Sequence, residues 1–207
     1  FVADIGEVAD KLGLRQFVLG GNSMGGKHAL AFAVAHPERL TGLVLVDGSG
    51  GPMLKLDTRK DEDSGNIGFK IAQTPGINLL VEQITPRSLI QQSLEQSVSV
   101  KSVASEAAVT RYWELLRYPG NRRATLARFS MPYDPLAAAD IAKVTTPTQV
   151  LYGQRSYPFV ARSVARWCAG NAHVRAQVVP GGHCFMQENP KDSASIVFNF
   201  LRQQAKE

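Results

Sequence analysis

The sequence has 207 residues, 44% of them hydrophobic and 20% charged, which is ordinary for a globular protein and favours one domain with an insertion. The net charge is +5, but the basic residues are scattered and form no run interleaved with aromatic residues, which argues against a nucleic-acid-binding protein. The two cysteines indicate no disulfide framework, and no apolar run reaches the ~18 residues of a membrane span, so the default expectation is a cytoplasmic protein.

The N-terminal part predicts alternating helices and strands. Residues 2–13 predict a helix, because apolar side chains recur there at helical spacing. Residues 16–20 predict a strand, and the small residues from 26 to 36 predict a helix that ends before Pro37. Residues 43–46 are continuously apolar, which is typical of a strand in a parallel sheet that is buried on both faces.

The middle of the chain, from residue 53 to residue 140, has a different character. Helical segments are separated there by turn signals, and no strand is evident, so this part predicts an all-helical insertion. Beyond it, residues 148–152 and 174–179 predict strands, with a helix at 159–169 between them. Partial alternation in 174–179 favours an edge strand, and a final helix is expected over residues 190–201.

The run Gly21-Asn22-Ser23-Met24-Gly25 lies between the first strand and the helix that follows it. This strand–turn–helix context is that of a G-x-S-x-G nucleophile elbow, in which a serine sits on a sharp, strained turn. Glycine neighbours make such a turn sterically possible, and the start of a helix favours developing negative charge. The alternative is a glycine-rich loop with an incidental serine.

The order of these elements resembles the α/β-hydrolase superfamily, which also places its histidine after its serine. Several segments carry the resemblance: Gly21-Asn22-Ser23-Met24-Gly25-Gly26, His36-Pro37-Glu38-Arg39-Leu40, Leu43-Val44-Leu45-Val46-Asp47, Pro147-Thr148-Gln149-Val150-Leu151-Tyr152-Gly153, Gly181-Gly182-His183, Glu188 and Pro190. The resemblance implies a three-layer α/β fold with a parallel sheet and an all-helical cap. The hydrolase core would comprise residues 1–52 and 141–207, and the cap residues 53–140.

The resemblance also implies roles for individual residues. Ser23 would be the nucleophile, and His183 would be the base that removes its proton. The backbone N–H of Met24 would supply half of an oxyanion hole, while its side chain would line the substrate pocket. No cofactor or metal is implied.

The catalytic acid is where this sequence departs from the family pattern. The strand at 148–152 is usually followed by Gly-x-x-Asp, but here Gly153 is followed by Gln-Arg-Ser, and Ser156 stands in the aspartate position. Ser156 is interpreted as a cap for the next helix. Asp47, at the end of the strand after the elbow, is the alternative acid, although aspartate is also a common turn residue. A dyad of Ser23 and His183 without an acid is the third possibility.

The family normally has about four strands before the elbow, and a loop among them carries a His-Gly-type motif that supplies a second oxyanion N–H. This sequence has only one helix before the elbow. We therefore expect the chain to be the C-terminal two-thirds of such a hydrolase. The outer edge of the elbow strand would then be left open in this fragment.

The first prediction for function is a serine hydrolase that cleaves a carboxylic ester of an apolar substrate. Apolar residues in the helical insertion, such as Trp113 and Leu115, favour an apolar small-molecule partner. The alternative is a carbon–carbon bond hydrolase of meta-cleavage-type products, since the elbow is similar to those of ring-cleavage-product hydrolases. A non-catalytic hydrolase-like binding protein is a further alternative, supported by Ser156 in the acid position and by the missing oxyanion segment.

Overall fold

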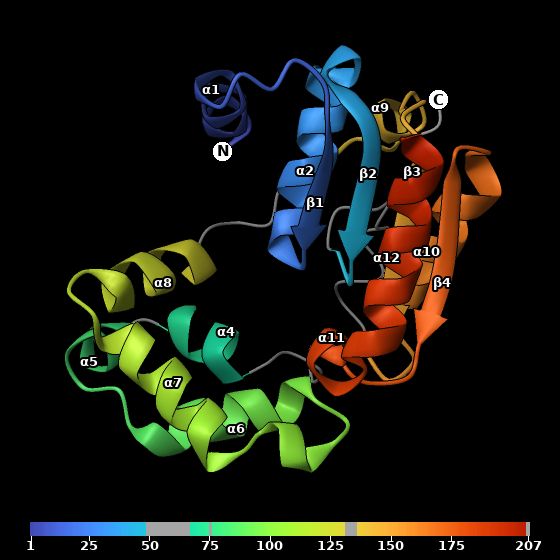
Figure 1. Cartoon of the computed structure of the whole chain (residues 1–207). Helices are drawn as coiled ribbons and strands as arrows, with labels where there is room; N and C mark the ends of the chain where they lie inside the picture. Colours follow the sequence, from blue (N-terminus) through green and yellow to red (C-terminus); the bar gives the residue numbers. More distant parts are fainter. Residues whose placement is uncertain (49–66, 75, 131–135, 206–207) are drawn as a thin grey trace. The chain divides into compact units, whose positions relative to one another are not determined.

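The computed structural model describes residues 1–48, 67–74, 76–130 and 136–205. The chain divides into two compact units (Figure 1): Phe1–Thr58 together with Pro135–Glu207, and Arg59–Asp134. The domain boundary predicted between residues 52 and 53 lies outside the described residues. The boundary predicted between residues 140 and 141 falls inside α9 (Ala138–Ile141). The predicted domain limits therefore remain predictions.

The first unit is built on a four-stranded parallel sheet in the order β1-β2-β3-β4. Its strands are β1 (Phe17–Asn22), β2 (Leu40–Val46), β3 (Thr148–Gly153) and β4 (Val174–Val179). Among the described residues β4 has one strand neighbour, as the alternation in its sequence predicts. Because all four strands run in the same direction, their carboxyl ends meet at one edge of the sheet.

Helices cover both faces of this sheet, which confirms the predicted three-layer α/β arrangement (Figure 1). One face is covered by α2 (Met24–Ala35) and α10 (Pro158–Gly170). The other face is covered by α12 (Pro190–Gln204), next to the short α11 (Phe185–Glu188). Alternate residues of β2 enter two separate hydrophobic clusters, one on each face: Leu43 and Leu45 in one, Val44 and Val46 in the other. This two-sided burial explains why the strand is apolar throughout.

The first helix, α1 (Val2–Lys11), confirms the helix predicted at the N-terminus. Its apolar side is only partly covered, because Val8 is 57% exposed and Leu12 is 68% exposed. An apolar groove runs between α1, β1 and α2. Arg39, which ends the 3-10 helix η1 (Pro37–Arg39), secures this corner by donating to Asp10 Oδ1 at 2.7 Å and to the Leu14 carbonyl at 2.9 Å.

The described part of the second unit, residues 67–74 and 76–130, contains helices and no strand, as expected for the insertion. The helices are α4 (Ile67–Ala72), α5 (Ile77–Gln83), α6 (Arg87–Ser97), η2 (Lys101–Val103), α7 (Glu106–Arg117) and α8 (Asn121–Ser130). Trp113 Nε1 donates to the Thr85 carbonyl at 2.9 Å, and the Arg117 guanidinium lies 4.0 Å from the Trp113 ring centroid. Trp113 therefore packs within its own unit, whereas Leu115 is 44% exposed.

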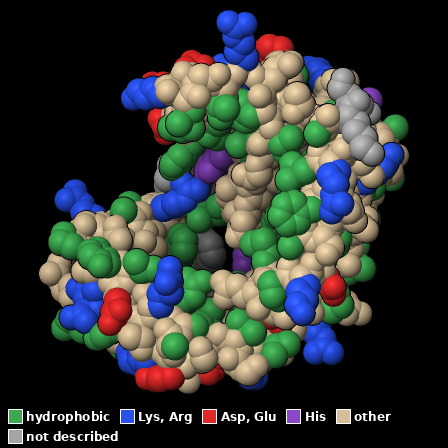
Figure 2. Space-filling view, viewed as in Figure 1, with side chains coloured by type: hydrophobic (Ala, Val, Ile, Leu, Met, Phe, Trp, Pro, Cys, Tyr) green, Lys and Arg blue, Asp and Glu red, His purple; other side chains and the backbone are tan. Residues whose placement is uncertain are grey.

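The surface agrees with the charge pattern of the sequence. On the face shown in Figure 2, lysine and arginine side chains are spread over both units among hydrophobic and acidic ones. On this face they do not gather into one continuous basic stripe. Within the described residues, no helix has the length and apolar character needed to cross a bilayer.

Candidate active site

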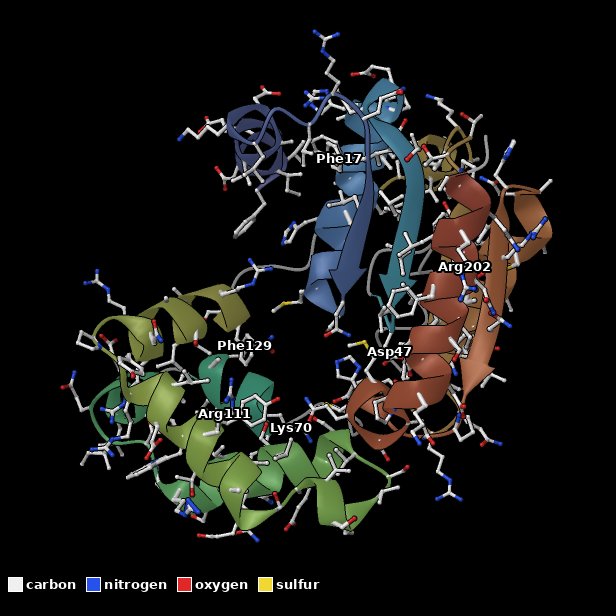
Figure 3. All side chains as sticks on the ribbon, viewed as in Figure 1. Phe17, Asp47, Lys70, Arg111, Phe129 and Arg202 are labelled. Carbon is white, nitrogen blue, oxygen red and sulfur yellow. The ribbon has the colours of Figure 1, made fainter. Side chains whose placement is uncertain are left out.

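The carboxyl ends of the four strands each lead to one residue of the candidate site. Ser23 follows β1, and Asp47 follows β2, where Figure 3 labels it. Ser156 lies three residues after the end of β3, and His183 lies four residues after the end of β4. Parallel strands thus bring together residues that are far apart in the sequence, at the edge where α/β sheets bind ligands.

The backbone of Ser23 has the strained geometry expected of a nucleophile elbow. Its φ of 51° and ψ of −121° lie in a region that residues other than glycine seldom adopt. The turn is fixed to the end of β2, because Ser23 N and Asn22 Nδ2 each donate to the Val46 carbonyl at 2.9 Å. Ser23 is the N-cap residue of α2, yet its side chain makes no capping hydrogen bond, so the hydroxyl is not used to hold the helix.

Two glycines make this turn possible. A Cβ on Gly21 would lie 2.4 Å from the Gly25 carbonyl oxygen, and one on Gly26 would lie 2.8 Å from the Gly48 Cα. Both contacts are with backbone atoms, which cannot rotate away as a side chain can. The close packing of the turn against α2 and against the end of β2 therefore requires glycine at positions 21 and 26.

Asp47 lies in the interior, and both oxygens of its carboxylate have polar partners. The residue is 1% exposed, and it adopts a positive φ of 45°. Its Oδ1 accepts from Gly153 N at 3.0 Å, and its Oδ2 accepts from the Ser156 hydroxyl. The same Oδ2 contacts His183 Nδ1. Burial of a carboxylate is costly unless it is hydrogen-bonded, and these contacts offset that cost.

The prediction that Ser156 caps the following helix is wrong. The N-cap of α10 is Tyr157, which makes no side-chain capping hydrogen bond, and the Ser156 hydroxyl binds Asp47 instead. The local sequence pattern predicted that this hydroxyl would cap the helix, but it donates to a buried carboxylate that is distant in the sequence. This contact was not predicted from the sequence. Asp47 follows β2 and Ser156 follows β3, so the contact could be foreseen only if these two strands were known to be neighbours.

His183 is held by the segment that joins β4 to α11. Gly182 N donates to Glu188 Oε1 at 2.7 Å, and Asn189 Nδ2 donates to the Pro180 carbonyl. The ring of Tyr157 lies with its centroid 5.3 Å from that of the His183 ring. Because Nδ1 faces the Asp47 carboxylate, Nδ1 carries the hydrogen and Nε2 is left as the basic nitrogen. The His183 side chain is 20% exposed, so it reaches the surface of the site.

Cys184, next to His183, is unsuited to act as a nucleophile. Burial raises the pKa of its thiol to about 11, and the nearby charges of Glu188 and Asp47 raise this pKa as well. The thiol therefore stays protonated at neutral pH, and the thiolate is the reactive form of cysteine. Within the described residues, no group of three or more histidine, cysteine or acidic side chains is arranged to hold a metal ion.

Gly153 joins the Asp47 carboxylate to the loop that carries His183, and we expect Gly153→Ala to be strongly destabilising. A Cβ there would lie 2.2 Å from the Gly182 carbonyl oxygen and 2.9 Å from that of Gly181. Urea unfolding should show a loss of about 2–3 kcal/mol, because the backbone of the His183 loop must move. Gly170→Ala is the matched control, since a Cβ at that position meets no atom within 4 Å. Equal stability of the two variants would contradict this prediction.

Comparison with known proteins gives relatives along nearly the whole chain. The 2-hydroxymuconate semialdehyde hydrolase of Pseudomonas putida is 29% identical over 205 residues, covering 94% of this chain and 65% of the relative. A 2-hydroxy-6-oxononadienedioate/2-hydroxy-6-oxononatrienedioate hydrolase of Burkholderia vietnamiensis is 30% identical over 211 residues, with the same coverage of 94% and 65%. This chain thus spans about two-thirds of the length of these curated relatives, 65% in each case.

The same fold is found among solved structures. A meta-cleavage product hydrolase from Pseudomonas fluorescens IP01 matches 98% of this chain and 71% of its own, with a TM-score of 0.79 and 18% identity. At that identity the likeness concerns the fold alone. A family model described as the alpha/beta hydrolase family matches residues 1–196. The chain therefore belongs to the alpha/beta hydrolase family.

Proposed function

We propose that the complete protein is a serine hydrolase that cleaves a carbon–carbon bond in meta-cleavage-type products, which are 2-hydroxy-6-oxo-dienoates. The names of the curated relatives support this choice over the ester hydrolase first predicted from the sequence. The residues of the candidate site suit either reaction, because both begin with attack of a nucleophile on a carbonyl carbon. The proposed substrate class therefore rests on the names of the relatives, and the proposed mechanism rests on the geometry of the candidate site.

The observation that carries the mechanism is the contact of His183 Nδ1 with the buried Asp47 carboxylate, at the sheet edge that also bears Ser23. In the proposed mechanism, Ser23 Oγ attacks the carbonyl carbon while His183 Nε2 accepts its proton. Asp47 holds the ring in the required tautomer and stabilises the imidazolium that forms. The backbone N–H of Met24, at the start of α2, donates to the oxyanion.

Before the attack, the dienol takes its keto form, in which the proton of the 2-hydroxyl group has moved to the carbon next to the reacting carbonyl. The tetrahedral intermediate then collapses, and the bond between this carbon and the carbonyl carbon breaks. The electron pair passes through the conjugated system to the C2 carbonyl oxygen and forms a dienolate, which accepts the proton held on His183. Water then attacks the acyl group on Ser23, with His183 again accepting a proton, and an acid is released.

Direct comparison of two chromogenic substrates tests this proposal on the complete polypeptide that carries these residues. 2-Hydroxy-6-oxo-6-phenylhexa-2,4-dienoate loses its colour on cleavage and yields benzoate, whereas p-nitrophenyl butyrate reports ester hydrolysis. We expect kcat/KM for the dienoate to be higher by about 100-fold. Faster ester cleavage would favour the first prediction instead. Absence of both activities, together with no labelling of Ser23 by a fluorophosphonate, would favour the non-catalytic binding protein.

A further inference from the structure

The Asp47 carboxylate is held by the turn after β3 as well as by His183. Gly153 N donates to Oδ1 at 3.0 Å, and the Ser156 hydroxyl donates to Oδ2. Oδ2 is also the atom that contacts His183 Nδ1. One turn therefore binds both carboxylate oxygens, and it reaches the oxygen that faces the histidine through a single side chain.

The turn that carries Ser156 is fixed by its own backbone. Ser156 N donates to the Gly153 carbonyl at 3.1 Å, which closes the turn. Gln154 N donates to the Val179 carbonyl at 2.8 Å, and Arg155 N donates to the Gly181 carbonyl at 2.8 Å. These bonds tie the turn to the end of β4 and to the segment before His183. The Ser156 hydroxyl is thus placed by the same segment that places the histidine.

The hydrogen bond from the Ser156 hydroxyl lies at a carboxylate that is shielded from water. The Asp47 side chain has no exposed surface, so water does not replace a lost hydrogen bond there. Rotation of the carboxylate about its Cβ–Cγ bond would carry Oδ2 away from Nδ1. Gly153 restrains Oδ1, and Ser156 restrains Oδ2. Without Ser156, the histidine that the carboxylate must orient would be the only partner of Oδ2, whereas Ser156 fixes Oδ2 independently of His183.

We propose that Ser156 is a positioning residue that holds the Asp47 carboxylate in the plane required to orient His183. This inference rests on the proposed serine hydrolase mechanism and adds to it a residue that acts only through Asp47. Ser156 need not touch substrate, and the hydroxyl itself is the functional group. Threonine, which keeps a hydroxyl, should therefore preserve the positioning role, and alanine should abolish it.

The kinetic test uses Ser156→Ala and Ser156→Thr in the complete polypeptide, assayed with the substrate that it cleaves. We expect Ser156→Ala to lower kcat by about 10- to 100-fold with KM unchanged, since a hydrogen bond to a charged group is lost. Ser156→Thr should recover most of this loss. In an Asp47→Asn background, Ser156→Ala should have no further effect, because its target is already gone. Additive losses in the double variant would overturn the proposal.

A second measurement is independent of turnover, so it separates failure of this inference from failure of the proposed function. Proton NMR of histidine-labelled protein should show a downfield Nδ1–H signal of His183, assigned by its loss in Asp47→Asn. We expect Ser156→Ala to shift this signal upfield and broaden it, and Ser156→Thr to restore it. A sharper signal further downfield would show that Ser156 competes for Oδ2, and an unchanged signal would show that it does nothing; either overturns the proposal.

Ser193→Ala is the matched control for both measurements. Its hydroxyl donates to the carbonyl of Asn189, the N-cap residue of α12, at 2.8 Å, so the variant also removes one hydrogen-bonded serine hydroxyl. It should leave both kcat and the His183 signal unchanged. A loss equal to that of Ser156→Ala would assign the effect to general packing and overturn the positioning role.

Discussion

Replacement of Ser23 by alanine is expected to lower kcat by about 10⁵-fold in the complete polypeptide, because the residue that forms the covalent intermediate is removed. The fold should be retained. The Ser23 hydroxyl caps no helix, and alanine at a φ of 51° meets the same backbone strain as serine. Stopped-flow loss of the dienoate chromophore, with circular dichroism as a check of folding, measures both expectations.

Ser193→Ala is also the control for this experiment, since it deletes a hydrogen-bonded serine hydroxyl in the same unit. Its activity should remain within about twofold of the parent, as is usual for a change away from the reacting groups. A fluorophosphonate probe should label the parent and Ser193→Ala, and should leave Ser23→Ala unlabelled. Residual activity of Ser23→Ala near the parent level would remove Ser23 from the nucleophile role.

Asp47→Asn is expected to lower kcat by about 10³- to 10⁴-fold while the protein stays folded. The amide that replaces Oδ2 can donate but not accept, so His183 loses the acceptor that fixes its Nδ1–H tautomer. Oδ1 can still accept from Gly153 N, which preserves the turn after β3. Steady-state kinetics and thermal unfolding of the same preparation separate the catalytic loss from any loss of structure.

Asp192→Asn is the matched control for Asp47→Asn. It removes the same charge from an exposed position in the first turn of α12. We expect this variant to lose about 0.3–1 kcal/mol of stability and to keep its activity unchanged. If Asp47→Asn stays within tenfold of the parent, the acid is not needed. The site would then work as the dyad of Ser23 and His183 that the sequence left open.

Much of the fold could be predicted because it depends on local patterns. The apolar run of β2 predicts a strand buried on both faces, and its side chains do alternate between two clusters. The elbow was predictable because G-x-S-x-G stood between a strand and a helix, and Ser23 does have a positive φ. The helix α11, in contrast, was missed, because four residues are too few to show a helical period.

The surroundings of Asp47 could not be predicted, because they depend on which strands are neighbours. Asp47 and Ser156 are 109 residues apart in the sequence, and Asp47 and His183 are 136 apart. No spacing in the sequence encodes these contacts. The serine near the start of α10 fits a local capping rule, and the tertiary contact with a buried carboxylate overrides that rule. Only the sheet order, with β2 next to β3, resolves the choice.

The convergence of Ser156 and His183 on one oxygen of Asp47 also bears on how such a site can change by mutation. Residues 47 and 156 follow two adjacent strands, and their side chains meet beside His183 Nδ1. A carboxylate could therefore move from one strand to the other by two substitutions, with no change in topology. The intermediate with aspartate at both positions would place two carboxyl groups in one dry space, where they would share a proton. At high pH both carboxyl groups of this intermediate would have to be ionised side by side, so we expect its activity to fall there.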